Sequence, residues 1–162
     1  MKASIPALAI AALFASGCPS AYQRTLDADA QRIEQQHQRK IEAQEEAERQ
    51  DARKYVAVVL FAVNSAEIDD AALHELDWFL EKLRPYSNVY IDVKGYTDST
   101  GSEPHNQPLS NKRAWVVQDY LVSRGVSPDH ISASGFAEAN PAEPNVSEPG
   151  RKQNRRAEVR VR

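Results

Sequence analysis

An acidic and a basic residue flank a polar, glycine-containing segment, and together they can hold a ligand that carries both charges. Residues 95–101 read Gly-Tyr-Thr-Asp-Ser-Thr-Gly, and Arg113 follows them in a helical pattern. The carboxylate of Asp98 can accept hydrogen bonds from an ammonium group, and the planar guanidinium of Arg113 can bind a carboxylate through two parallel hydrogen bonds. The two residues therefore suit a zwitterion. Alternatively, they pair with each other and stabilise the loop.

A strand and a helix are expected to bring Asp98 and Arg113 to one cleft. Apolar and polar residues alternate over residues 89–94, which predicts a strand with one buried face. Asp98 lies on the loop that follows this strand. A helix is expected from about residue 106 to residue 124, with Gly125 as its left-handed C-cap, so Arg113 lies in its first turns.

The remaining patterns complete one folded domain over residues 55–162. A β-branched apolar run predicts a central strand that is buried on both faces. The helix after it is expected to be capped by Asp69 or Asp70 and ended by Pro85. That first strand covers residues 55–61. The later elements are strands at 131–136 and 157–161 and an exposed loop at 139–149. The order β-α-β-α-β-loop-β predicts an α+β fold, with a mixed sheet and helices packed on one face.

The N-terminal residues are typical of an export signal. An apolar run follows Lys2 and is too short for a membrane span of about 20 residues, so residues 1–17 are expected to be a signal peptide. Small residues precede Cys18 and resemble a bacterial lipobox, which implies that residues 18–22 form an N-terminus with acyl chains such as palmitate on Cys18. An ordinary cleaved signal with an incidental cysteine is the alternative. In enterobacterial lipoproteins, Asp directly after the acylated cysteine often signals retention in the inner membrane. This chain has Pro19 there, which favours the outer membrane.

Residues 23–54 form a charged segment between the anchor and the domain. They are rich in Gln, Glu, Arg and Ala and contain no Gly or Pro, which favours helix. Apolar residues are too sparse for a sustained coiled coil, so a helical spacer is expected. A flexible, partly disordered linker is the alternative.

The motifs of the domain, taken together, resemble the OmpA-like, or Pal-like, peptidoglycan-binding domain. They are Gly-x-Thr-Asp-x-x-Gly at 95–101, Asn-x-x-Leu-Ser-x-x-Arg-Ala at 106–114, Gly-Val at 125–126, Asn-Pro at 140–141 and Gly-Arg-x-x-Asn-Arg-Arg at 150–156. The resemblance implies that Asp98 accepts hydrogen bonds from the ammonium of diaminopimelate in the cell-wall stem peptide. Arg113 would hold the carboxylate on the same centre, and Thr97 and Asn106 would line the pocket.

One position departs from the family pattern. The family often has Asp directly after the Phe that ends the first strand, whereas this chain has Ala62. We expect reduced affinity for the ammonium, or partial substitution by Asn64. His105 is expected to be a solvated loop residue.

Two further sets of residues have structural interpretations. Of Arg155 and Arg156, one is expected to pair with a carboxylate at the core edge and the other to be solvated, and the sequence does not distinguish them. Leu109 and Ser110 are expected to be helix-start and packing residues, with Ser110 as a possible cap of the helix.

Several functional classes are disfavoured by composition and motifs. The net charge of −3, from 20 basic and 23 acidic residues, provides no cationic field for nucleic acid. No nucleophile-elbow motif indicates an enzyme, and the four histidines and single cysteine lack metal-ligand spacing. No glycine-rich phosphate loop precedes a helix, so no cofactor is expected.

These observations together predict a cell-envelope protein. The expected function is a peptidoglycan-binding lipoprotein, anchored in the outer membrane with its domain in the periplasm, that links the membrane to the wall. The alternative is a regulatory or assembly lipoprotein whose domain mainly binds another envelope protein.

Overall fold

The computed structural model describes residues 21–162 as an α+β protein, which confirms the predicted fold class. The export signal and Cys18 lie outside the described residues. The elements are α1 (Ala21–Ala52), β1 (Val56–Leu60), α2 (Asp70–Leu83), β2 (Ile91–Gly95), α3 (Glu103–Ser123), the 3-10 turn η1 (Pro128–His130), β3 (Ile131–Gly135), α4 (Glu148–Asn154) and β4 (Arg156–Val161). Residues up to Ile41 and residues from Glu42 onward belong to separate compact units.

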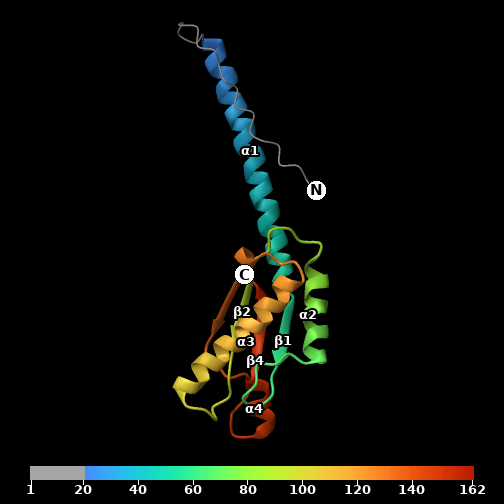
Figure 1. Cartoon of the computed structure of the whole chain (residues 1–162). Helices are drawn as coiled ribbons and strands as arrows, with labels where there is room; N and C mark the ends of the chain where they lie inside the picture. Colours follow the sequence, from blue (N-terminus) through green and yellow to red (C-terminus); the bar gives the residue numbers. More distant parts are fainter. Residues whose placement is uncertain (1–20) are drawn as a thin grey trace. The chain divides into compact units, whose positions relative to one another are not determined.

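The four strands form one mixed sheet in the order β1-β4-β2-β3. Strand β4 is antiparallel to β1 and β2, whereas β2 and β3 are parallel. The carboxyl ends of β1 and β2 therefore lie beside the start of β4, where Leu60 pairs with Arg156 and Gly95 pairs with Ala157. The loops after β1 and β2 and helix α4 lie together at this end of the sheet (Figure 1).

The prediction that the first strand is central is wrong, because β1 is an edge strand. Ala57 and Val59 are buried, but Val58 between them is 42% exposed. The central strand next to it is β4, whose polar residues Glu158 and Arg160 alternate with buried ones. An apolar run reports that its side chains can pack, and it carries no information on which strands pair beside it.

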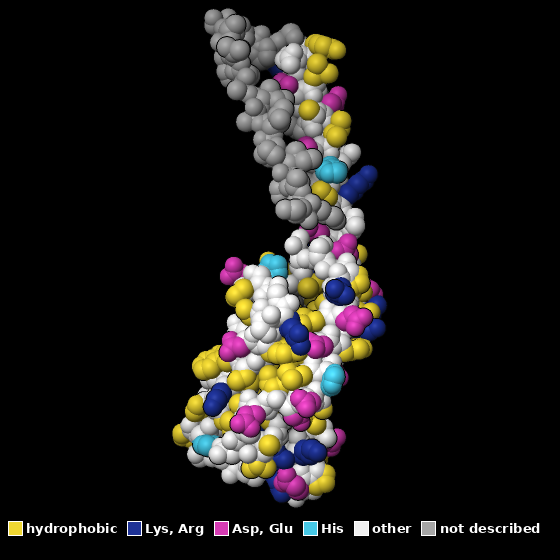
Figure 2. Space-filling view, turned by 45° about the vertical axis from the view of Figure 1, so that its right-hand side comes forward, with side chains coloured by type: hydrophobic (Ala, Val, Ile, Leu, Met, Phe, Trp, Pro, Cys, Tyr) yellow, Lys and Arg dark blue, Asp and Glu magenta, His cyan; other side chains and the backbone are white. Residues whose placement is uncertain are grey.

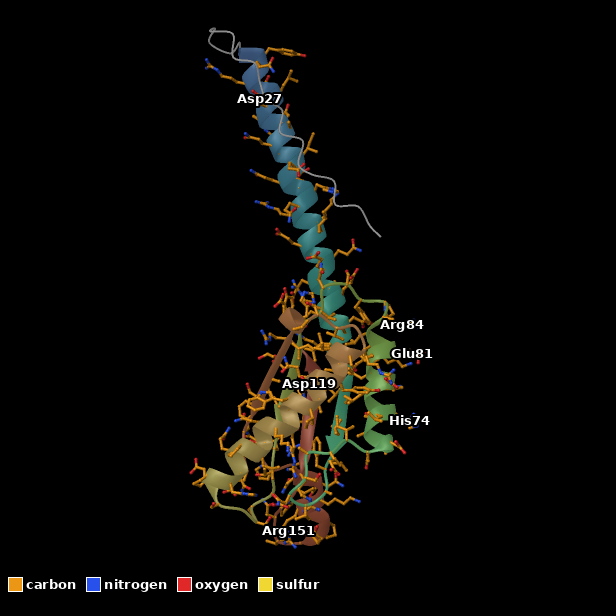
Figure 3. The ribbon with its side chains drawn as sticks, viewed as in Figure 1. Asp27, His74, Glu81, Arg84, Asp119 and Arg151 are labelled. Carbon is orange, nitrogen blue, oxygen red and sulfur yellow. The ribbon has the colours of Figure 1, made fainter. Side chains whose placement is uncertain are left out.

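Helices α2 and α3 cover one face of the sheet and enclose the core (Figure 1). Asp69 caps α2 by accepting a hydrogen bond from Ala72 N at 2.8 Å, as expected for one of the two candidate caps. The apolar stripe of α2 is buried, whereas His74, Glu81 and Arg84 lie on its outer side (Figure 3). The core comprises chiefly Ala57, Val59, Phe61, Leu76, Phe79, Ile91, Val93, Val117, Leu121, Val159 and Val161.

Helix α3 begins earlier than its apolar pattern predicts. Its N-cap is Ser102, and Pro104 lies in its first turn, where the missing N–H of proline costs nothing. Ser110 is therefore not a cap: its hydroxyl donates to Gln107 O at 2.9 Å and accepts from Ala137 N at 3.0 Å. Gly125 has a φ of 98°, which confirms the left-handed C-cap.

The sequence predicts no helix between the exposed loop at 139–149 and the last strand, but the structure has helix α4 there. Ser147 caps it and accepts a hydrogen bond from Gly150 N. Gly150 is packed so closely that a Cβ would lie 2.1 Å from Pro144 O. The short helix thus depends on a cap and a close approach that hydrophobic periodicity does not reveal.

Helix α1 is the helical form expected of the charged segment. Its last turns belong to the unit that begins at Glu42. Ala52 is fully buried in the core, Glu45 accepts a hydrogen bond from Asn88 at 3.2 Å, and Asp51 accepts one from Tyr86.

The surface carries both signs of charge. On the face of the compact unit shown in Figure 2, basic and acidic side chains are interspersed. Among the described residues, no helix is long and apolar enough to cross a membrane.

Candidate ligand-binding site

Asp98 is a buried carboxylate on the loop after β2, with 4% of its surface exposed. It accepts hydrogen bonds from the backbone N–H of Thr100 at 3.1 Å and from the Thr100 hydroxyl. Its other oxygen forms an ion pair with Arg155 Nη1 at 2.8 Å. Burial alone raises the pKa of Asp98, but the hydrogen bonds from Thr100 and Arg155 outweigh it and hold the pKa below its usual value.

Arg113 is a fully buried guanidinium on α3, with 0% of its surface exposed. It donates to three backbone carbonyls: Nε to Ser65 O at 2.8 Å, Nη1 to Tyr96 O at 2.7 Å and Nη2 to Ala62 O at 3.1 Å. Burial lowers its pKa to about 10, and the nearby charge of Asp98 partly offsets this effect. Arg113 is therefore still a cation at neutral pH.

The alternative that Asp98 and Arg113 pair with each other is not what the structure has. The ion-pair partner of Asp98 is Arg155, and in the described part of the chain the hydrogen-bond acceptors of Arg113 are all backbone carbonyls. Each of the two charges is thus held in place by other groups, and both remain beside a shared space.

All four residues predicted for the site line one cavity of about 110 Å³. Thr97 is buried, and its hydroxyl has no hydrogen-bond partner among the described residues. Asn106 donates from Nδ2 to Asp98 O at 3.3 Å and to Gly101 O at 3.1 Å, so it closes the loop that carries Asp98. The lining also includes Val63, Asn64, Thr100, Gly101, His105, Leu109 and Arg155.

Two glycines allow the loop to lie this close to α3. A Cβ on Gly95 would lie 2.1 Å from Ser110 O, and one on Gly101 would lie 2.4 Å from Asn106 Oδ1. Contacts of that length do not occur, so side chains at these positions would separate β2 or its loop from the helix.

The sequence did not predict that Arg155 and Arg156 would both be buried, and the expectation of one solvated arginine is wrong. Arg155 pairs with Asp98 and with Glu148, each at 2.8 Å, and lines the cavity. Arg156 lies with its guanidinium carbon 4.1 Å from the ring centroid of Tyr96 and pairs with Glu158 at 2.8 Å. Both sides of β4 are covered at its start, which a strand pattern alone cannot show.

The rim of the cavity is formed by the loop after β1. Ala62 is exposed, and its carbonyl is one of the acceptors of Arg113. Asn64 Oδ1 lies 3.0 Å from His105 Nε2, and both residues line the cavity. His105 is exposed as expected, but it also bridges this loop to α3.

A metal role finds no support in the described part of the chain. No group of three or more His, Cys, Asp or Glu residues between positions 21 and 162 could hold a metal ion.

A buried carboxylate and a buried guanidinium thus lie beside one cavity at this end of the mixed sheet. The sequence model of the OmpA family matches residues 60–155, and the chain belongs to this family.

Known relatives share the domain. The chain is 41% identical over 103 residues to the peptidoglycan-binding protein ArfA of Mycobacterium tuberculosis, covering 64% of this chain and 32% of ArfA. It is 44% identical over 91 residues to outer membrane protein A of Escherichia coli O157:H7, covering 54% of this chain and 26% of that protein. The chain thus matches a third or less of these relatives' length.

A solved structure has the same fold. The peptidoglycan-associated lipoprotein of Burkholderia pseudomallei superposes with a TM-score of 0.62 at 26% identity, covering 65% of this chain and 90% of that one.

Proposed function

We propose that the domain binds peptidoglycan non-covalently by gripping the zwitterionic side-chain end of diaminopimelate in the stem peptide. The observation that carries the proposal is the buried guanidinium of Arg113, which borders the same cavity as the Asp98 carboxylate and donates to backbone carbonyls. A buried cation that has no hydrogen bond to a carboxylate among residues 21–162 favours a ligand that supplies one. The relatives named for peptidoglycan support the same polymer as ligand.

Each charge at the cavity has hydrogen-bonding capacity left for a ligand. Both terminal nitrogens of Arg113 carry a second N–H, which suits a bidentate carboxylate. The Asp98 oxygens retain lone pairs beyond those used by Thr100 and Arg155, and these can accept from an ammonium. The Thr97 hydroxyl, which has no hydrogen-bond partner between positions 21 and 162, can bond to either group. Asn106 contributes by holding the loop that carries Asp98. The proposed function is binding without catalysis.

We further propose that the chain is a lipoprotein with acyl chains on Cys18, so that it links the outer membrane to the wall from a periplasmic domain. The small residues before Cys18 and the apolar run after Lys2 support this. The similarity to an outer membrane protein and to a peptidoglycan-associated lipoprotein is consistent with it.

A second candidate function is an envelope regulatory or assembly lipoprotein whose domain mainly binds another protein. Ala62 favours it, because the rim of the cavity has no carboxylate at that position to help hold an ammonium. The two functions differ in their dependence on the cavity.

Sedimentation with purified sacculi tests the proposal. We expect the wild-type chain to co-sediment, and Asp98→Asn and Arg113→Lys to bind roughly tenfold or more weakly, because each loses a charge-assisted or bidentate contact. Arg124→Ala is the matched control, since Arg124 is an exposed cation at the end of the same helix. If both folded variants sediment like the wild type, the cavity is not the site, and the second candidate gains.

A further inference from the structure

A larger hollow adjoins the proposed diaminopimelate cavity, and we call it the α3 groove. It measures about 670 Å³. Its lining comprises Asn64, Ser65, Ala66, Glu67 and Ile68 of the loop after β1, with Lys112 and Val116 of α3. Asn64 lines both hollows, so a ligand chain that leaves the cavity past this residue enters the groove.

The wall of the groove is held by the same arginine that borders the cavity. Arg113 points inward and donates to the carbonyls of Ala62 and Ser65, which fixes the loop against α3. Its neighbour Lys112 is exposed and lines the groove. Two consecutive residues of α3 thus line different hollows: Lys112 lines the groove and Arg113 lines the cavity.

The groove carries two charges that are free of ion pairs in the described part of the chain. Both Lys112 and Glu67 are exposed and line it, and neither takes part in an ion pair there. By contrast, Arg124 at the end of the same helix pairs with Asp77 at 3.0 Å. The ammonium of Lys112 is therefore available to a ligand.

We propose that Lys112 binds a carboxylate in the peptide part of the same wall ligand, and that the α3 groove holds that part. This rests on the proposed function. When Asp98 and Arg113 hold the side-chain end of diaminopimelate, its other end is joined to the rest of the stem peptide. That peptide must extend out of the cavity, and the α3 groove adjoins the cavity at Asn64. The glutamate next to diaminopimelate in the stem peptide is linked through its γ-carboxyl group, so its α-carboxylate is free to meet the cation. Glu67 would repel the same group.

The test compares two probes on the full-length chain by isothermal titration calorimetry. The probes are free meso-diaminopimelate and the tripeptide alanyl-γ-glutamyl-diaminopimelate. Because exposed ion pairs are weak, we expect Lys112→Met to weaken tripeptide binding roughly two- to fivefold and to leave free diaminopimelate unchanged. Glu67→Gln should tighten tripeptide binding by a similar factor. Lys82→Met on α2 is the matched control and should change neither.

The outcomes separate this inference from the function on which it rests. If free diaminopimelate binds but Lys112→Met binds the tripeptide as the wild type does, the inference is wrong and the cavity stands. If the wild type binds neither probe, both fail. A tripeptide with an amide in place of the glutamate carboxylate checks the contact, because it should bind equally to the wild type and to Lys112→Met.

Discussion

At the scale of single residues, the site is a small set of buried charges in unequal numbers. Two guanidinium groups, Arg113 and Arg155, and one carboxylate, Asp98, line the cavity. Arg155 is neutralised by Asp98 and Glu148, whereas Arg113 has carbonyl dipoles against it. The two guanidinium groups outnumber the one carboxylate that lines the cavity, and this favours a ligand that supplies a carboxylate, since a buried cation is costly unless it is well paired.

The lowered pKa of Asp98 predicts a pH dependence of stability. A carboxyl group whose folded-state pKa lies below its unfolded value stabilises the fold above the unfolded pKa and loses that contribution as pH falls through the folded pKa. We therefore expect the free energy of unfolding to fall as pH decreases below about 4, and to fall less steeply in Asp98→Asn.

Urea unfolding at several pH values measures this effect, with Asp119→Asn as the control because Asp119 is exposed on α3 (Figure 3). At neutral pH the Asp98→Asn variant should be less stable by roughly 1–3 kcal/mol, because Arg155 loses a buried charged partner. Parallel pH profiles for wild type and variant would contradict the assignment of Asp98 as a stabilising buried anion.

At the scale of elements, the site depends on how closely α3 lies on β2. Gly95 ends β2 against the backbone of Ser110, and Arg113 follows one turn later on α3. The short distance between strand and helix brings the Arg113 guanidinium to the carbonyl of Tyr96.

Alanine at two glycines separates close packing from backbone conformation. A Cβ on Gly95 would meet Ser110 O at 2.1 Å, whereas Gly125 has a φ of 98° and nothing within 4 Å of its Cβ position. We expect Gly95→Ala to cost roughly 2–3 kcal/mol through overpacking and to weaken sacculus binding. Gly125→Ala should cost about 1 kcal/mol through its left-handed backbone and leave binding unchanged. Equal costs measured by chemical denaturation would argue against the close approach of α3 and β2.

At the scale of the whole molecule, the proposed role requires attachment at one end of the chain and wall binding at the other. The cavity lies in the unit from Glu42 onward, and the proposed anchor at Cys18 precedes α1. The two activities are therefore expected to be separable by mutation.

Replacing the proposed anchor tests this separation. We expect Cys18→Ser to abolish palmitate labelling and to shift the protein from the membrane fraction to the soluble fraction, because stable attachment needs the acyl chains. Sacculus binding by the released protein should remain. Unchanged labelling in Cys18→Ser would show that Cys18 is not the acylated residue and would contradict the proposed anchor.

The amino-acid sequence by itself determined the class of fold and four of the residues that line the cavity. Alternation over residues 89–94, the cap at Asp69 and the left-handed Gly125 are local features, and local preferences and periodicity are sufficient to predict them. Asp98 and Arg113 could be selected from the sequence because of their opposite charges and the OmpA-like motifs around them.

The partners of these residues were decided only by the tertiary structure. Strand order placed β4 in the centre and brought Arg155 to Asp98 from 57 positions away, whereas β1 became an edge strand. Strand pairing and side-chain burial depend on contacts between distant segments, which no local pattern records. The same contacts formed the α3 groove, because its two walls come from a loop and a helix that meet only in the folded domain.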